Sequence, residues 1–183
     1  MARVNIVGDG PGGLSAALFL AKNGHEVRVF GQDKTAMNFA YLRNYLGIPE
    51  IDGTEFQGIA RQQVQRFGAA LVDEEVTSVE AGDDGFTVTS ASGDAGSDYL
   101  ILTEGKSPTL ARSLGVGEGD EGAIEVDANY MSSIDKVYVV GRAVRPTRSQ
   151  AIISAGAGAV AALDILAREE GKDVQDWDTP PKE

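Results

Sequence analysis

A glycine-rich turn at the start of the chain limits the possible folds more than any other feature. Five mostly apolar residues, Arg3–Val7, lead into Gly-Asp-Gly-Pro-Gly-Gly, and an apolar run from Leu14 to Asn23 follows. A strand, G-x-G-x-x-G and a helix in this order are typical of a dinucleotide-binding βαβ unit. Gly8 allows the tight turn, Gly10 lets the backbone approach a pyrophosphate, and Gly13 lets the helix pack closely on the strand. The free N–H groups of the helix would then bind phosphate. The alternative is a glycine-rich turn without a ligand.

The composition excludes several classes of site and partner. The 183 residues include no cysteine and one histidine. This excludes a disulfide, a thiolate metal site and a dithiol redox centre in this chain, and argues against any histidine-based metal site or triad. The net charge of −12 argues against nucleic acid or an anionic membrane as a partner. Without an evident signal peptide or membrane-spanning run, we expect a cytoplasmic protein. Its acidity is typical either of a halophilic organism or of an ordinary acidic cytosolic protein.

Residue periodicity and turn signals place the other elements, and the length predicts one domain, or at most two very small ones. Strands are expected at 26–30, 69–72, 77–80, 86–90, 98–103 and 137–140, and helices at 54–68, 107–114 and 149–170. Two or three antiparallel strands should follow the first βαβ unit. Thr54 and Ser149 are expected to cap their helices. Residues 35–51 are interpreted as a loop with one short helix, and 171–183 as a disordered tail.

The end of the second strand departs from the dinucleotide-binding pattern. In that pattern an acidic residue at this position binds the ribose hydroxyls. This chain has Gly31 there, followed by Gln32 and Asp33. Either Gln32 or Asp33 reaches the ribose from further along the chain, or the adenosine is held less tightly or by backbone alone.

Four separated stretches are similar to one family. The first is the Gly8–Gly13 turn, and the second is R-N-Y-L-G-I-P at 43–49, similar to E-N-Y-P-G-F-P. The third is Y-L-I-L-T-E-G at 99–105, similar to a hydrophobic strand ending in A-T-G. The fourth joins V-Y-V-V-G-R at 137–142 to S-Q-A-I-I-S-A-G-A-G at 149–158, similar to V-F-A-A-G-D and R-Q-A-x-x-x-A-G-x-G. The chain thus resembles the FAD domain of low-molecular-weight thioredoxin reductases and related pyridine nucleotide–disulfide oxidoreductases.

This resemblance implies an α/β fold of Rossmann type, with a central parallel sheet, a small antiparallel layer and helices on the faces. It also implies a role for each matching residue. The pyrophosphate would be bound by Gly8, Gly10, Pro11, Gly12 and Gly13, the adenosine side by Val76 (through its backbone), Thr103 and Gly105, and the flavin side by Asn44, Gly141, Ser149, Gln150 and Ala151. The start of the last helix would stabilise negative charge at the N1/O2 edge of the reduced flavin.

Two positions depart from this family pattern. Arg142 stands where the family has an Asp that accepts hydrogen bonds from the ribityl chain, and Glu104 stands within the A-T-G position. An arginine cannot accept those bonds, but it can bind a pyrophosphate bidentately. With Arg145 and Arg148 it could form an anion clamp for cofactor phosphate or an acidic partner; otherwise the three are solvated arginines. No side chain stands out as a catalytic acid, base or nucleophile.

The spacing of the motifs predicts the domain organisation. In the family, an NADPH domain bearing C-x-x-C is inserted after the A-T-G strand. Here only residues 106–124 join the two halves, which is too short for a nucleotide-binding domain. We therefore expect a single FAD-binding domain over 1–170 that is not itself a thioredoxin reductase.

The expected function follows from this organisation. It is a flavoprotein that binds FAD noncovalently and transfers electrons from an external donor, NAD(P)H or a carrier protein, to an unknown acceptor. A homodimer is also expected, because an isolated FAD domain exposes apolar surface. The first alternative is a non-enzymatic binding or regulatory protein with weak or absent flavin. The second is an NAD- or ADP-ribose-binding module that uses the N-terminal turn alone.

Overall fold

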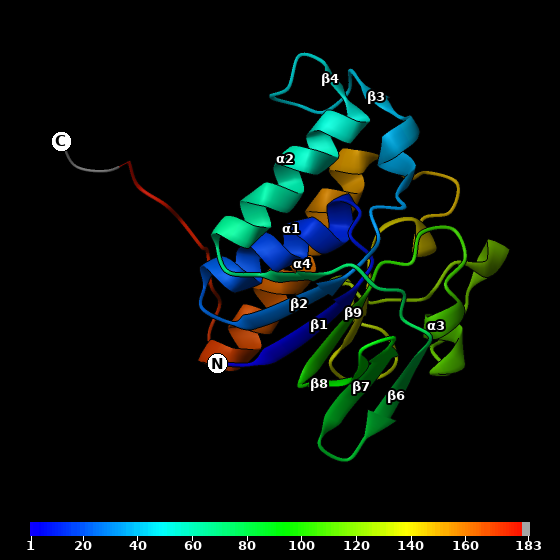
Figure 1. Cartoon of the computed structure of the whole chain (residues 1–183). Helices are drawn as coiled ribbons and strands as arrows, with labels where there is room; N and C mark the ends of the chain where they lie inside the picture. Colours follow the sequence, from blue (N-terminus) through cyan, green and yellow to red (C-terminus); the bar gives the residue numbers. More distant parts are fainter. Residues whose placement is uncertain (181–183) are drawn as a thin grey trace.

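A five-stranded parallel sheet forms the centre of the computed structural model, which describes residues 1–180 (Figure 1). The strand order is β10-β9-β1-β2-β5, and every neighbouring pair is parallel. The strands are β1 (Arg3–Val7), β2 (Glu26–Phe30), β5 (Ala70–Val72), β9 (Tyr99–Leu102) and β10 (Val137–Val139). The chain moves from β1 to β2 on one side and later returns to β9 on the other. The sheet therefore has a topological switch point between β1 and β9, where α/β folds bind their ligands.

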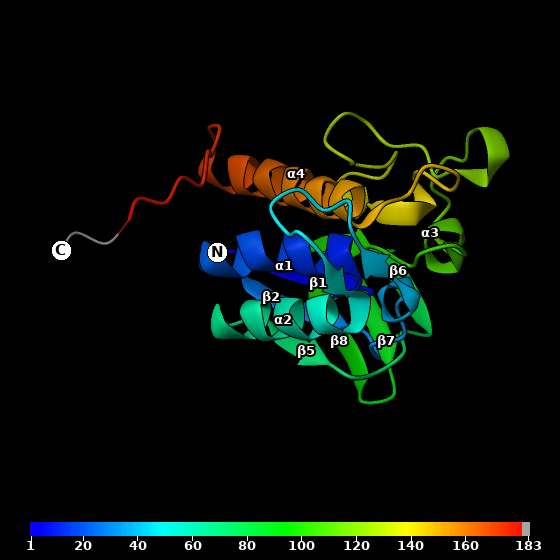
Figure 2. The same ribbon diagram turned by 90° about the horizontal axis from the view of Figure 1, so that it is seen from above.

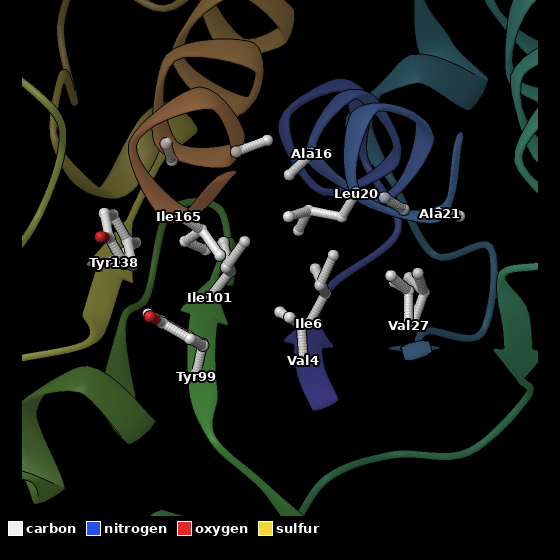
Figure 3. Close-up of a cluster of buried hydrophobic side chains, with 14 of the residues drawn as sticks. Val4, Ile6, Ala16, Leu20, Ala21, Val27, Tyr99, Ile101, Tyr138 and Ile165 are labelled. Carbon is white, nitrogen blue, oxygen red and sulfur yellow. The ribbon is translucent and has the colours of Figure 1, made fainter. Parts of the chain in front are cut away.

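Three helices cover one face of this sheet (Figures 1 and 2): α1 (Pro11–Lys22), α2 (Gly53–Arg66) and α4 (Ala151–Glu170). Alternate strand residues point toward them, since side chains alternate between the faces of a strand. Figure 3 shows Val4, Ile6 and Ile101 of the sheet beneath Leu20 of α1 and Ile165 of α4. All five side chains are fully buried. This buried cluster fixes α1 and α4 relative to the strand ends.

A three-stranded antiparallel sheet covers the opposite face (Figure 1). Its strands are β6 (Ser78–Gly82), β7 (Gly85–Ser90) and β8 (Gly93–Ser97), and α3 (Thr109–Ser113) lies beside them. The intervening strand residues, such as Leu100, Leu102 and Val139, pack here with Phe86 and Val88 in a second buried cluster. Because both faces of the parallel sheet are buried, its strands are apolar almost throughout. The predicted fold class is thus confirmed.

Several predicted elements need correction. The third antiparallel strand is β8, whose Gly-Asp-Ala-Gly-Ser sequence lacks strand-forming residues, whereas the predicted strand at 98–103 joins the parallel sheet as β9. The predicted loop at 35–51 contains the expected short helix, Ala36–Phe39, and also β3 (Tyr41–Leu42), which pairs with β4 (Ile51–Asp52). Strands of two residues are too short to show alternation.

The predicted helix caps are also wrong in detail. Asp52, not Thr54, caps α2, and its carboxylate accepts a hydrogen bond from the Thr54 N–H at 2.9 Å. Gln150, not Ser149, is the N-cap residue of α4, and it makes no side-chain capping bond. The first helix begins at Pro11, earlier than the apolar run suggested. The N-terminal turns of α1 and α4 therefore both lack a side-chain cap, which leaves their N–H groups available.

The last helix and the segment after it complete the fold. By length and hydropathy alone α4 is apolar enough to cross a membrane, contrary to the expectation that no such run exists. Its buried residues Ala157, Ala161 and Ile165 belong to the main core cluster. Residues 171–180 form no helix or strand, and Asp176 forms a salt bridge with Lys22 of α1 at 3.0 Å. Disorder of 171–183 stays a prediction, and 181–183 lie outside the described residues.

Candidate functional site

The turn between β1 and α1 is so tightly packed that two of its glycines, Gly8 and Gly13, cannot be replaced. Gly8 has φ +105°, and a Cβ built on it would lie 2.4 Å from the carbonyl oxygen of Thr103. A Cβ on Gly13 would lie 2.1 Å from the carbonyl oxygen of Gly8. Both contacts are with backbone, which cannot move aside as a flexible side chain can. The turn therefore has the close-packed conformation that the sequence motif predicts.

The helix α4 approaches the same turn from the other half of the chain. A Cβ built on Gly158 would lie 2.0 Å from the carbonyl oxygen of Gly12, and one on Gly12 would lie 3.2 Å from the carbonyl oxygen of Ser154. The two helices are thus in backbone contact close to their N-termini. Because a helix N-terminus carries partial positive charge, two such charges lie near one edge of the sheet.

The ends of three neighbouring strands meet at this edge. Gly8 follows β1, Thr103 follows β9 and Gly141 follows β10. A Cβ on Gly141, which has φ +79°, would lie 3.6 Å from Thr103 Oγ1. Thr103 therefore lies between the two glycine-bearing strand ends. The structure brings together the two distant motifs that the sequence analysis placed on one nucleotide.

The loop at 43–49 is joined to the start of α4 by one hydrogen bond. Asn44 Nδ2 donates to Gln150 Oε1 at 3.0 Å. In the same region, the Tyr45 and Phe56 rings pack with their centroids 5.3 Å apart. Both rings line a small cleft with Pro11 of α1 and Ala155 of α4. Three predicted site regions, the turn, the loop and the start of α4, are therefore adjacent.

A buried carboxyl group lies at the end of β2, and the sequence analysis missed it. The side chain of Asp9 is 5% exposed and forms a salt bridge with Arg61 of α2. Its Oδ2 also accepts a hydrogen bond from the Asp33 N–H at 3.0 Å. Burial raises the pKa of Asp9, while the Asp33 N–H and the Arg61 charge oppose that rise. An Asp inside G-x-G together with a Gly at the end of β2 was the signal that could have revealed it.

The two residues predicted to reach the ribose are arranged differently. Gln32 Oε1 accepts a hydrogen bond from Lys34 Nζ at 2.8 Å. Asp33 is exposed, has φ +55° and uses its N–H to hold Asp9. That either side chain reaches the ribose stays a prediction.

Glu104, which departs from the family pattern, has a structural role. Its carboxylate accepts hydrogen bonds from the Leu110 N–H at 2.7 Å and the Ala111 N–H at 2.9 Å. Burial raises the pKa of Glu104, and these hydrogen bonds oppose the rise. Glu104 therefore caps α3 instead of entering the nucleotide site.

The other predicted residues lie around the same edge. Arg142, Arg145 and Arg148 are exposed, and none of their side chains forms a hydrogen bond or salt bridge with another residue of 1–180. Val76 is buried in the second core cluster, so only its backbone could contact a ligand. Gly105, three residues after the end of β9, has φ +79°. Within residues 1–180 no group of three or more His, Asp or Glu residues could hold a metal ion.

Comparison with known proteins shows the family to which the chain belongs. The model of the family described as pyridine nucleotide-disulphide oxidoreductase matches residues 2–112 of the chain. The chain belongs to this family. The matched residues include both the Gly8–Gly13 turn and β9, the strand at the switch point.

Curated relatives within this group support the assignment. A thioredoxin reductase of Peptoclostridium litorale is 30% identical over 146 residues, which are 75% of this chain and 46% of that protein. A ferredoxin–NADP reductase of Levilactobacillus brevis is 28% identical over 180 residues, 91% of this chain and 50% of that protein. The chain therefore spans about half the length of the curated relatives it matches.

Solved structures share the fold. A thioredoxin reductase from Gloeobacter violaceus superimposes with a TM-score of 0.86 at 16% identity, covering 98% of this chain and 99% of that chain. An atypical thioredoxin reductase from Desulfovibrio vulgaris Hildenborough gives a TM-score of 0.84 at 18% identity, covering 93% and 99%. Family and relatives together make this an FAD-binding domain of oxidoreductase type, with FAD as the cofactor.

The residues present fit this cofactor. The close packing of Gly8 and Gly13 against backbone keeps the turn tight, and the N-terminal N–H groups of α1, which lack a side-chain cap, can then bind a pyrophosphate. The fully buried Gln57 has an Oε1 atom without a hydrogen-bond partner in residues 1–180. Its Nε2 donates to the backbone oxygen of Asp9 at 2.6 Å, so the unpaired oxygen lies beside the turn. An unpaired buried acceptor is expensive unless a ligand or water supplies a donor.

Proposed function

We propose that this chain is a single-domain flavoprotein that binds FAD noncovalently and transfers electrons without a dithiol centre. The observation that carries the proposal is the convergence of the Gly8, Thr103 and Gly141 strand ends beside the uncapped start of α4. Any nucleotide would use the turn at Gly8 to bind its phosphates, whereas only a flavin ring would use the start of α4. No cysteine is present in the sequence, so the proposed electron transfer does not pass through a dithiol of this chain.

In this proposal the chain holds the two halves of FAD with different elements. The turn Gly8–Gly13 and the α1 N-terminus bind the pyrophosphate, and Thr103, Gly105 and the Val76 backbone contact the adenosine side. Gly141, Arg142, Asn44 and residues 149–151 surround the flavin side, where the Asn44–Gln150 hydrogen bond fixes the loop against α4.

Bound FAD supplies one- and two-electron redox chemistry at its isoalloxazine ring. The uncapped N–H groups at the start of α4 would stabilise negative charge on a bound flavin ring and would so favour its reduced form. No side chain is assigned as a catalytic acid, base or nucleophile. The electron donor comes from outside, as NAD(P)H or a carrier protein. The names of two relatives, ferredoxin–NADP reductase and thioredoxin reductase, include a pyridine nucleotide and carrier proteins.

The proposal also covers the protein's setting. We infer a cytoplasmic protein without nucleic-acid or membrane partners, consistent with its net charge of −12. A halophilic source is consistent with the same acidity. A homodimer would cover exposed apolar side chains such as Leu46, which is 90% exposed, and Phe39, which is 95% exposed.

A visible absorption spectrum tests the main proposal. Protein purified in high salt should show flavin absorbance, and heat should release a compound that chromatography identifies as FAD. Anaerobic addition of NADH or NADPH, followed by bleaching of the flavin bands, would identify a pyridine nucleotide as the donor. A colourless protein that takes up no FAD would refute the proposal.

A second candidate function is that of a non-enzymatic binding or regulatory protein. The observation in its favour is Arg142, exposed and unpaired within the described residues at a position where the family has an acceptor for the ribityl chain. An NAD- or ADP-ribose-binding module is a third candidate, but it gives the Asn44–Gln150 contact no role. The spectrum separates the first proposal from both alternatives, because one predicts weak or absent flavin and the other predicts none.

A further inference from the structure

The acidic residue inside the phosphate turn fills the space beside the end of β2. A Cβ built on Gly31 would lie 2.4 Å from Asp9 Cγ and 2.6 Å from Asp9 Oδ1. A side chain at 31 and the observed Asp9 conformation therefore exclude each other. The dinucleotide-binding pattern has its ribose-binding acid at the end of this strand. In this chain a carboxyl group is present in that space, but it comes from the turn instead of from β2.

Groups from two other segments hold Asp9 in this orientation. Its Oδ2 accepts the Asp33 N–H at 3.0 Å and also forms the salt bridge with Arg61. Gln57 Nε2 holds the Asp9 backbone oxygen at 2.6 Å. No other described residue donates a hydrogen bond to Oδ1. One oxygen of a fixed carboxylate is thus left as an acceptor.

A second unpaired acceptor belongs to a residue that contacts the Asp9 backbone. Gln57 is 0% exposed, and its Oε1 has no hydrogen-bond partner among residues 1–180. Its amide already contacts Asp9, so this oxygen belongs to the same small region. The unpaired Oδ1 of Asp9 can accept hydrogen bonds from a ligand that offers two neighbouring donors. The 2′ and 3′ hydroxyls of a ribose are such a pair.

We propose that Asp9 is the residue that binds the adenosine ribose, accepting hydrogen bonds from its hydroxyls through Oδ1, while Gln57 holds the Asp9 backbone in place. Arg61 and the Asp33 backbone act as positioning groups. Arg61 has an additional electrostatic role, because its charge offsets the negative charge that Asp9 places close to a pyrophosphate. The inference rests on the proposed dinucleotide binding. It also explains why Gly31 is compatible with nucleotide binding.

The test measures the preference for ribose hydroxyls rather than affinity alone. The full chain is titrated calorimetrically with ADP and with 2′,3′-dideoxy-ADP, which lacks both hydroxyls. Wild-type protein should bind ADP at least about tenfold more tightly than the dideoxy analogue, the effect of one or two lost hydrogen bonds to a charged group. Asp9→Asn should reduce this preference several-fold, and Asp9→Gly should abolish it. Because each protein is compared with itself, a general loss of stability does not produce the result.

An exchange of the two positions provides the matched control. The double variant Asp9→Gly/Gly31→Glu restores a carboxylate at the end of β2, where the space is vacated, and should recover the preference for ADP. Gly31→Glu alone should bind ADP more weakly than wild type, because its side chain meets Asp9. Circular dichroism and the melting temperature verify that each variant is folded.

Two results would overturn the inference. One is a wild-type protein that binds ADP and its dideoxy analogue equally; the other is an Asp9→Gly variant that keeps the wild-type preference. Either result leaves the proposed function intact if the wild type still takes up FAD. A wild type that shows the preference but takes up no FAD would instead remove the proposed function and keep this inference.

Discussion

The close contact between α1 and α4 should require a glycine, which has no Cβ, at position 158. A Cβ there would lie 2.0 Å from the Gly12 carbonyl oxygen, whereas real Cβ atoms essentially never approach another atom closer than 3.0 Å. In Gly158→Ala the two helix backbones must therefore separate by about 1 Å. Overpacking of this kind costs about 1–3 kcal/mol in the free energy of unfolding. The better helix propensity of Ala offsets up to about 1 kcal/mol of that cost.

Gly156 offers a matched control on the same helix. It is exposed, and a Cβ built on it would meet nothing within 4 Å. Gly156→Ala should thus gain up to about 1 kcal/mol from propensity without any clash. The difference between the two variants isolates the clash, about 1–3 kcal/mol, or roughly 2–12 °C in melting temperature for a chain of this size.

The assay combines stability with ligand binding. Urea unfolding followed by circular dichroism gives the free energies, and flavin fluorescence gives the FAD affinity of each variant. Gly158→Ala should also bind FAD more weakly, because its clash moves the start of α4 away from the phosphate turn. Gly156→Ala should bind FAD as the wild type does. A Gly158→Ala protein as stable as Gly156→Ala would refute the inferred backbone contact.

Three further predictions concern single side chains. Burial lowers the pKa of His25 below its ordinary value of 6.5, and His25 Nδ1 accepts the Ala2 N–H at 3.1 Å. The unfolded chain therefore binds a proton that the folded chain does not, so the free energy of unfolding falls as the pH drops below about 6.5. Melting temperatures measured from pH 7.5 to 5 should fall less steeply in His25→Gln than in the wild type. Equal slopes for the two proteins would contradict this role of His25. Glu104→Ala should lower the free energy of unfolding by about 1 kcal/mol through loss of the α3 cap, measured in urea, while a large loss of FAD affinity would place Glu104 in the site after all. Arg142→Asp should tighten FAD binding by restoring an acceptor for the ribityl chain, and weaker binding in a fluorescence titration would identify Arg142 as a phosphate ligand instead.

The sequence by itself determined the fold class and the location of the phosphate turn. A continuous apolar strand, a G-x-G-x-x-G turn and an apolar helix are local features, and they leave little choice of backbone conformation. The same holds for Val137–Gly141 and the glycines of α4, whose spacing carried the resemblance to FAD domains.

Only the tertiary structure decided what the departures from the family pattern mean. Glu104 caps α3 through residues that follow it, and Asp9 reaches a space that belongs to Gly31 on another strand. Such relations depend on side-chain direction and on contacts between distant segments, which one sequence does not encode locally. The short strands β3, β4 and β8 were missed for a similar reason, because pairing with a neighbour defines them rather than their own residues. Local backbone chemistry thus specified where a nucleotide could bind, and packing specified which side chains face it.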